Sequence, residues 1–436
     1  MGTIAKENRL MGEMETLPLE EKLIKEPLYP TFPKLDKMVK FGKKLRQCVR
    51  IAFSIWGITS SKKPPGPIYA QFGIADPCNH KCVMCGDHPP ETHVSETTKS
   101  AFYNTPGIMS FEHYKGILDD LHERGTVDIE MVGQGEPMLN KHIVDMVAYA
   151  KKKGMYVRIV TNGSRLFAKQ AEAFVDLGLD RLQLSLNAGD PETYPKIHVT
   201  ESPENFKKVI ANIRYLTDYK RKVGREAPYT RISFVITSRN CAELDKMVAV
   251  VHEMGADEAI FNHTVVHEGS QDLKMSEQQY KDMMASIPAA KELAEKLGVN
   301  ANLNTFAATP PSYMYEVIKG PQVVPCYVGW YFARVLGNGS VLPCCQCTKP
   351  LSEIENADDF GKSWDSDHYN NFRDAARALP EQSEMLSGCE CDHCVLRPRN
   401  ISIHNLLNPF NKIKAGDSEM LYHVSDIFKS RKDDKN

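Results

Sequence analysis

Three cysteines lie within eight residues of one another, at Cys78, Cys82 and Cys85, and no fourth cysteine lies nearby. An iron–sulfur cube has four irons, and each iron needs a ligand. Three cysteines therefore leave one iron open to a substrate or a cofactor. The triplet also fits part of a structural zinc site with a distant fourth ligand, because zinc takes four thiolate or imidazole ligands. The spacing alone leaves both metals open.

The segment before the cysteines narrows this choice. Residues 68–75 form a short, mostly apolar run that predicts a strand, and the cysteines follow its carboxyl end. In a β/α barrel, the loops at the carboxyl ends of the strands form the catalytic face. The position therefore favours a reactive cluster over a structural zinc site.

Helix and strand patterns then alternate, and most predicted helices end at a glycine. Strands are predicted at residues 127–132, 156–160, 181–186, 231–236 and 258–264, and helices at 110–124, 141–153, 166–177, 203–222, 242–254 and 276–297, the last with a break at Pro288. Such alternation predicts an α/β fold with a parallel sheet and right-handed crossovers. Six units are two short of a closed barrel, so we expect a partial (β/α)6 TIM-like barrel with an open side.

The pattern changes near residue 300 to short strands, turns and seven cysteines. Residues 335–342 predict a hairpin around Asn338 and Gly339. A small segment of this kind needs a metal to hold its fold. We therefore expect four parts: a helical extension and linker (1–67), the partial barrel (68–299), an iron–sulfur domain (300–400) and a C-terminal tail (401–436).

The amino-acid composition indicates the class of protein and the compartment in which it works. The chain has 436 residues, of which 42% are hydrophobic and 25% charged, as in soluble globular proteins. A net charge of −2 gives no general attraction to nucleic acid. The twelve cysteines are mostly clustered, and the chain shows no signal peptide and no run of eighteen apolar residues. We therefore expect metal binding in a reducing cytoplasm.

The N-terminal region contains a basic amphipathic pattern. Between residues 34 and 57, apolar residues recur at helical spacing, and lysines and arginines largely fill the other faces. Such a helix either docks its apolar stripe on the barrel or binds an anionic membrane surface. The sequence leaves both open.

A Cys-x3-Cys-x2-Cys loop after the first strand of a six-unit β/α array resembles the radical S-adenosylmethionine superfamily. The resemblance implies that Cys78, Cys82 and Cys85 hold a [4Fe-4S] cluster whose open iron binds S-adenosylmethionine. The reduced cluster of this family cleaves that cofactor to a 5′-deoxyadenosyl radical. An electron donor such as flavodoxin or ferredoxin is implied as a partner.

Further residues match the segments with which this family binds its cofactor. They lie beside the third cysteine, in the Gly-Gln-Gly-Glu-Pro run after the second strand, and at the ends of the third, fourth and fifth strands. In the family these places contact the adenine, the methionyl amino group, the ribose and the carboxylate. The resemblance thus assigns to S-adenosylmethionine the residues Met84, Gly133, Gly135, Glu136, Thr161, Asn162, Ser185 and Asn240.

The later cysteines resemble the twitch domain, the short form of the SPASM extension in this superfamily. Cys326 and Cys344 are separated by seventeen residues, and a Cys-x2-Cys pair follows at residues 391–394. The resemblance implies one auxiliary iron–sulfur cluster. Its ligands would be Cys326, Cys344, Cys391 and Cys394. Two auxiliary clusters or a zinc ion remain alternatives, because the roles of Cys345, Cys347 and Cys389 are open.

The resemblance implies an oxidoreductase-like enzyme that abstracts a hydrogen atom and passes an electron to the auxiliary cluster. The spacing of the later cysteines is similar to that of a family dehydrogenase acting on an aminocyclitol, so we expect a small polar substrate such as a sugar or cyclitol. One alternative is a peptide- or protein-modifying maturase, and another is a non-catalytic iron–sulfur or zinc protein. No catalytic base is identified; candidate substrate contacts are Asp87, His88, His263, His267, Glu268, Tyr331 and Arg334.

Overall fold

The computed structural model describes residues 57–58, 64–93, 107–266, 268–308, 311, 324–345, 347, 349–354, 359–379 and 396–408. The chain divides into two compact units, Met1–Val49 and Arg50–Asn436, and every described residue belongs to the second. The amphipathic segment 34–57 lies outside the described residues except for Gly57. Cys389, Cys391 and Cys394 also lie outside them.

The second unit contains one ten-stranded sheet with the strand order β10-β9-β8-β1-β2-β3-β4-β5-β6-β7. Strands β1 to β7 follow in chain order, and each pairs in parallel with the next. The predicted six-strand parallel array is confirmed, and a short seventh strand extends its edge. The strands are β1 (Tyr69–Phe72), β2 (Asp128–Met131), β3 (Tyr156–Thr161), β4 (Arg181–Ser185), β5 (Tyr229–Ile236), β6 (Glu258–His263) and β7 (Asn300–Ala301).

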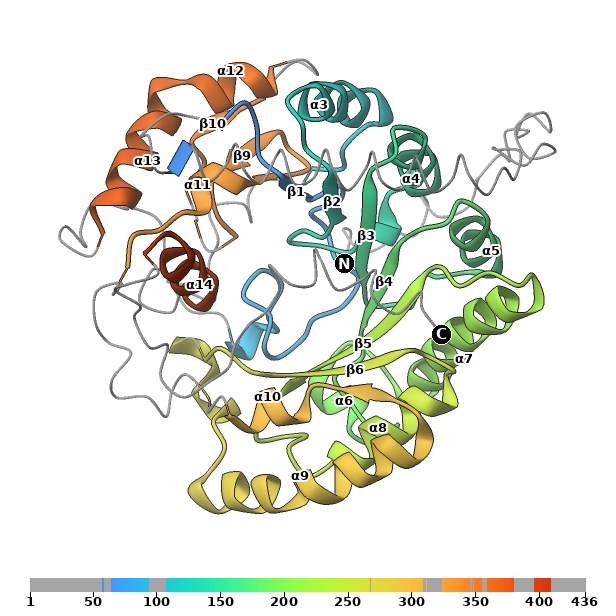
Figure 1. The fold of residues 1–436 in the computed structure, drawn as a ribbon. Helices are drawn as coiled ribbons and strands as arrows, with labels where there is room; N and C mark the ends of the chain where they lie inside the picture. Colours follow the sequence, from blue (N-terminus) through green and yellow to red (C-terminus); the bar gives the residue numbers. More distant parts are fainter. Residues whose placement is uncertain are drawn as a thin grey trace, which may run out of the picture. The chain divides into compact units, whose positions relative to one another are not determined.

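Helices cover the outer side of this curved sheet (Figure 1). Ser110, Ser202 and Ser276 begin three of them, because each hydroxyl accepts a hydrogen bond from the backbone N–H three residues later. Among the described residues, no helix is long and apolar enough to cross a membrane. The covering helices are α3 (Phe111–Glu123), α4 (Ile143–Lys152), α5 (Ala168–Asp176), α7 (Pro203–Lys222), α8 (Leu244–Glu253) and α9 (Glu277–Leu297), with short helices at α6 (Tyr194–Ile197) and α10 (Leu303–Ala308).

The break expected at Pro288 does not occur, because α9 is a single helix across this residue. Proline removes one backbone hydrogen bond from a helix interior and disfavours its continuation. The neighbouring side chains of Ile287 and Ala290 are buried. Packing against the rest of the core therefore outweighs the loss of that bond.

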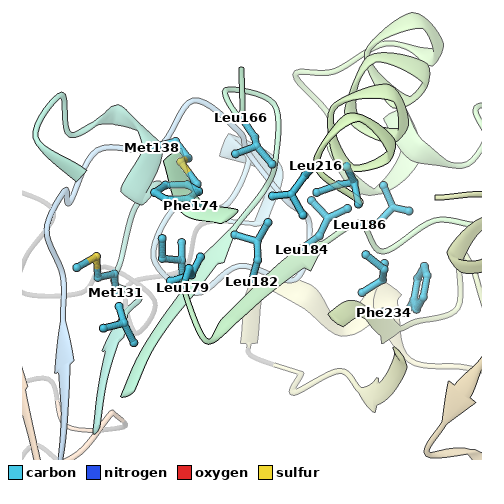
Figure 2. Packing of buried hydrophobic residues seen from close by; sticks show 14 of the residues in the cluster. Met131, Met138, Leu166, Phe174, Leu179, Leu182, Leu184, Leu186, Leu216 and Phe234 are labelled. Carbon is cyan, nitrogen blue, oxygen red and sulfur yellow. The ribbon is translucent and has the colours of Figure 1, made fainter. Parts of the chain in front are cut away.

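The core lies between the sheet and its helices. Along β4, Leu182 and Leu184 are fully buried, and they alternate with half-buried polar residues on the inner face of the sheet. Figure 2 shows these leucines close to Phe174 of α5 and Leu216 of α7. The alternation thus separates an apolar outer face from a polar inner face.

The C-terminal segment joins the same sheet. The predicted hairpin is confirmed as β8 (Phe332–Val335) and β9 (Ser340–Leu342), which pair antiparallel across a turn with Gly339 at φ +89°. Strand β8 pairs in parallel with β1, and β10 (Ser352–Glu353) follows β9. The predicted boundary at residue 300 therefore separates segments that share a sheet.

Among the described residues, further helices accompany this hairpin, and the last of them crosses the predicted boundary at residue 400. They are α11 (Val328–Tyr331), α12 (Phe360–Asp365), α13 (Asp367–Ala378) and α14 (Arg397–Leu407).

Asp76, in the loop after β1, holds the hairpin to the barrel. Its buried carboxylate accepts hydrogen bonds from the backbone N–H of Gly107 at 3.0 Å and of Gly337 at 3.2 Å. A Cβ atom on Gly107 would lie 2.6 Å from the backbone nitrogen of Asn338, so the two backbones meet at a distance that only glycine permits. The cysteine loop, residues 107–110 and the hairpin turn therefore form one joint.

Replacing Asp76 with alanine tests this joint. We expect the amides of Gly107 and Gly337 to exchange with solvent about tenfold faster, because each loses a charge-assisted hydrogen bond. Hydrogen–deuterium exchange with mass spectrometry measures this effect. The control is Asp119→Ala on the outer helix α3, which should leave both segments unchanged; equal exchange in Asp76→Ala and the unmodified protein would contradict the prediction.

Candidate active site

The three cysteines of the triplet lie in the loop that leaves β1. This loop runs on the inner side of the curved sheet (Figure 1). This loop is held by backbone hydrogen bonds to the segment after β4: Val83 N–H donates to the Ile197 carbonyl and Val199 N–H to the Lys81 carbonyl, both at 3.0 Å. The side chains of all three cysteines are partly exposed. A firmly placed loop thus presents three thiols at the carboxyl ends of the strands.

The electrostatics of these thiols suit metal binding. Burial raises the pKa of Cys78 to about 11 and that of Cys85 to about 12, and it also raises the pKa of Cys82. Without metal the thiols are therefore protonated at neutral pH, and a bound metal displaces the protons. Backbone N–H groups lie near two of the sulfurs, 3.4 Å from Cys78 Sγ and 3.2 Å from Cys85 Sγ. These donors stabilise a thiolate, so the residues fit an iron–sulfur cluster.

His198 is a neighbour that sequence reasoning missed. Its Nε2 lies 2.9 Å from the Leu186 carbonyl oxygen, so Nε2–H donates there, and its Nδ1 lies 3.0 Å from Cys82 Sγ. Burial lowers the pKa of His198 to about 4. Since His198 lies 116 positions after Cys82 in the sequence, no local motif could have linked them.

His80, Cys82 and His198 form the one potential metal-binding trio among the described residues, with ligand atoms within 4.8 Å of one another. The geometry of this trio is compatible with a zinc ion bound at Cys82. It competes with the cysteine triplet, because a thiolate already bound to a cluster iron is not available to close a zinc site.

The glycine-rich run after β2 packs directly on the cysteine loop. A Cβ on Gly135 would lie 2.1 Å from the Pro77 carbonyl oxygen and 2.3 Å from that of Asp76. The Glu136 N–H donates to the Pro77 carbonyl at 2.9 Å. A Cβ on Gly133 would similarly lie 2.6 Å from the Cα of Gly73. These glycines therefore allow two strand-end loops to lie backbone against backbone just before Cys78.

Glu136 joins the ends of β2 and β3. Its buried carboxylate accepts hydrogen bonds from Thr161 Oγ1 at 2.6 Å, from the Asn162 N–H at 2.7 Å and from the Met138 N–H at 2.9 Å. Burial raises the pKa of Glu136, and these hydrogen bonds oppose the rise. The carboxylate predicted to accept from the cofactor's ammonium is thus already held in place by its neighbours.

Asn162 extends these contacts to the cysteine loop. Its Nδ2 donates to Asn79 Oδ1 at 3.0 Å, and Asn79 Nδ2 donates to Ser164 Oγ at 2.9 Å. The Asn162 side chain also opposes the rise in the pKa of the Cys78 thiol. The end of β3 is therefore connected to the first cysteine of the triplet.

Ser185 and Asn240, both predicted to contact the cofactor, differ in whether their side chains are free to bind a ligand. Ser185 ends β4 and is partly exposed, and its hydroxyl forms no hydrogen bond within the described part of the chain. Asn240 is buried and donates to the carbonyls of Asn187 at 2.8 Å and Val235 at 2.9 Å, while its Oδ1 accepts from the Thr237 N–H at 2.7 Å. Ser185 is thus free to contact a ligand, whereas the Asn240 amide shapes the ends of β4 and β5.

Met84 packs partly against a small apolar cluster of Val83, Ile197 and Leu273. This thioether side chain leaves part of its surface accessible beside the cysteine triplet. A flexible apolar side chain in that place can adapt to a flat ring. The position stays compatible with the predicted adenine contact.

Charged residues line the inner face of the sheet near the amino ends of β2 and β3. The sequence did not predict these ion pairs. Arg158 lies 3.0 Å from Asp128 and 3.4 Å from Glu130, and its guanidinium stands 4.6 Å from the centre of the Tyr69 ring. The signal in the sequence was the alternation of charged and apolar residues along β2 and β3. These ion pairs lie at the amino ends of β2 and β3, at the opposite end of the strands from the cysteine loop.

The second group of cysteines lies beside the hairpin. Cys326, Cys344 and Cys347 are buried in one cluster with Trp330, and Cys345 packs partly against it. The Cys326 N–H donates to the Ala376 carbonyl of α13 at 2.9 Å. The structure thus places Cys326 and Cys344 in one buried cluster. The predicted ligands Cys391 and Cys394 lie outside the described residues and stay a prediction.

Comparison with known proteins gives matches to two families. The Radical SAM superfamily matches residues 74–234, and the SPASM iron–sulfur cluster-binding domain matches residues 326–395. Among curated proteins, a PqqA peptide cyclase from Streptomyces rochei is 25% identical over 307 residues, which cover 65% of this chain and 76% of that protein. The matched segments contain the two cysteine groups described above.

Solved structures share the fold. SuiB from Streptococcus suis aligns with a TM-score of 0.51 at 15% identity and covers 85% of this chain and 79% of its own. A structure named native anSMEcpe with bound AdoMet aligns with a TM-score of 0.52 at 14% identity, covering 78% of this chain and 100% of its own. These alignments support the partial barrel with a C-terminal extension.

Removing the three thiols tests the first cluster site. In Cys78→Ala/Cys82→Ala/Cys85→Ala we expect the iron content to fall by one cluster and reductive cleavage of S-adenosylmethionine to be abolished, because the cofactor loses its iron. Iron analysis and chromatography of 5′-deoxyadenosine measure the two effects. The control Cys241→Ala removes a buried cysteine elsewhere and should retain both; unchanged iron in the triple variant would contradict the assignment.

Adding a methyl group at Gly135 tests the packing of the two loops. We expect Gly135→Ala to slow S-adenosylmethionine cleavage at least about 100-fold, because its Cβ has no room beside the Pro77 carbonyl and must displace the cysteine loop. The control is Gly178→Ala, whose Cβ lies in open space although this glycine has φ +65°. That variant should lose only some stability; equal rates for both variants would refute the role of Gly135.

Proposed function

Because this chain is a radical S-adenosylmethionine enzyme with a C-terminal SPASM iron–sulfur domain, we propose that it modifies a peptide or protein by abstracting a hydrogen atom from it. The observation that carries this proposal is the similarity to a curated PqqA peptide cyclase over 76% of that protein's length. The cysteine spacing favoured a sugar or cyclitol substrate. The comparisons instead support the peptide alternative.

The cofactors follow from the two domains. The radical SAM domain uses a [4Fe-4S] cluster with S-adenosylmethionine, and the SPASM domain holds auxiliary iron–sulfur clusters. When bound and reduced, the first cluster and its cofactor supply a hydrogen-abstracting radical. We assign the first cluster to Cys78, Cys82 and Cys85, and an auxiliary cluster to Cys326, Cys344, Cys391 and Cys394.

The residues of the chain prepare the place where this chemistry occurs. Glu136 fixes the loops after β2 and β3 against each other, so their backbone groups keep a constant position beside the cysteines. The Ser185 hydroxyl offers a hydrogen bond to the cofactor from the inner face. Preorganised polar groups of this kind orient a bound molecule without further rearrangement.

Arg334 is the substrate-contact candidate with the best support. It lies on β8, beside Gln71 of β1, on the side of the sheet that carries the polar inner-face residues. Its Nη1 donates to the Cys345 carbonyl at 3.2 Å. The remaining donors of its guanidinium can bind a peptide carbonyl or a carboxylate between the two cysteine groups.

The expected partners follow from the electron balance. Abstraction of a hydrogen atom leaves an unpaired electron on the substrate. Passing that electron to an auxiliary cluster and releasing one proton to solvent completes a two-electron oxidation that removes two hydrogens. A one-electron donor such as flavodoxin or ferredoxin would reduce the first cluster. Because the thiols must stay reduced before the clusters assemble, we place this enzyme in the cytoplasm.

A fractionated extract distinguishes a peptide substrate from a small molecule. The reconstituted enzyme, dithionite and S-adenosylmethionine are incubated with fractions above and below the size of small metabolites, each with and without prior protease digestion. We expect the large fraction to increase 5′-deoxyadenosine formation and digestion to remove the effect. Mass spectrometry should then show a peptide that has lost two hydrogens.

Two outcomes would contradict the peptide proposal. Stimulation found in the small fraction and unchanged by digestion would favour the sugar or cyclitol substrate. Cofactor cleavage absent after full cluster reconstitution, even with dithionite, would favour a non-catalytic role. The triple cysteine variant serves as the control for cofactor cleavage that does not depend on the enzyme's first cluster.

A further inference from the structure

Asn400 contains a buried hydrogen-bond donor without an acceptor. The residue lies in α14 and is fully buried. Its Oδ1 accepts a hydrogen bond from the Tyr327 N–H at 3.1 Å. Its Nδ2 is buried as well, yet it forms no hydrogen bond with any described residue. Leaving an amide donor unpaired in a protein interior is costly, so such groups usually have a partner.

The position of this amide suggests the partner. Tyr327 directly follows Cys326, so the Asn400 amide is held beside the peptide that carries a proposed cluster ligand. Cys326 and Cys344 belong to the same buried cluster. Trp330, in that cluster too, has a second buried N–H donor without a partner among the described residues. Thiolates and inorganic sulfides accept N–H hydrogen bonds, and they would satisfy donors in this place.

We propose that Asn400 Nδ2 donates an N–H···S hydrogen bond to the auxiliary iron–sulfur cluster at Cys326 and thereby raises its reduction potential. The inference rests on the proposed assignment of Cys326 as a ligand. A reduced cluster carries one more negative charge than the oxidised cluster, so a donor to its sulfur stabilises the reduced form. Asn400 is thus a positioning residue that makes the auxiliary cluster a better acceptor of the substrate's electron.

His404 provides a matched control on the same helix. It lies one turn after Asn400, and its Nδ1 is 2.9 Å from the Tyr327 hydroxyl. Both residues therefore hold Tyr327 to α14. Only Asn400 has the unpaired buried donor, so His404→Phe loosens the same contact without removing that donor.

The experiment uses Cys78→Ala/Cys82→Ala/Cys85→Ala as background, so that only auxiliary iron contributes to the signal. Redox titration followed by electron paramagnetic resonance measures the reduced fraction of the cluster. We expect Asn400→Leu to lower the ratio of reduced to oxidised cluster about tenfold at a fixed ambient potential, with unchanged iron content. His404→Phe should leave this ratio unchanged. An unchanged ratio in Asn400→Leu, or an equal shift in His404→Phe, would overturn the proposal.

A second measurement needs no stable variant. The background protein is labelled with ¹⁵N only in asparagine side chains, and hyperfine spectroscopy of the reduced auxiliary cluster is recorded. Coupling to a side-chain ¹⁵N supports the hydrogen bond, and its absence overturns the proposal even if Asn400→Leu fails to fold.

Cys326→Ala in the same background tests the premise separately. If its auxiliary iron content and signal are unchanged, Cys326 is not a ligand and the assignment fails. If that signal is lost but the asparagine coupling is absent in the background protein, the assignment stands and only the role of Asn400 fails.

Discussion

The backbone of Asp76 and Pro77, immediately before the first cysteine, is the point on which the site depends. The Pro77 carbonyl accepts from the Glu136 N–H, and the Asp76 carbonyl lies 2.7 Å from Nε2 of His88, beyond the triplet. The Asp76 carboxylate meanwhile binds the hairpin turn through Gly337. Two residues therefore connect β1, the loop after β2 and the C-terminal extension. Each connection needs a glycine where a side chain would collide with backbone.

Local sequence patterns predicted much of the barrel but not this joint. Strands and helices of the six units follow from periodicity and caps, such as Ser276 with Gln279, which need only neighbouring residues. The cysteine triplet and the glycine-rich run were found for the same reason, since each is a short segment. Their close backbone packing was not predicted, because it depends on the approach of Gly135 to the Pro77 carbonyl, which no local pattern contains.

Contacts over long sequence separations account for what the sequence did not indicate. His198 contacts Cys82 from beyond β4, and Arg158 of β3 pairs with Asp128 of the neighbouring strand β2. The parallel pairing of β8 with β1 joins segments more than 250 residues apart. Neither periodicity nor spacing contains such information. In the sequence, Asn400 was only the last residue of the predicted iron–sulfur domain. Its position beside Cys326 became apparent only from its hydrogen bond with Tyr327.

The register between β1 and β8 then links the two cysteine groups. Tyr69 is paired with Phe332 and Gln71 with Arg334. A slip of one residue would reverse the faces of β8, so Arg334 would leave the inner face and an apolar neighbour would replace it. The Asp76 bond to Gly337 opposes such a slip, because it fixes the turn that ends β8. In the proposed reaction, electron transfer from substrate to auxiliary cluster would depend on the distance between them, and this register sets where the extension stands relative to the first cysteine loop.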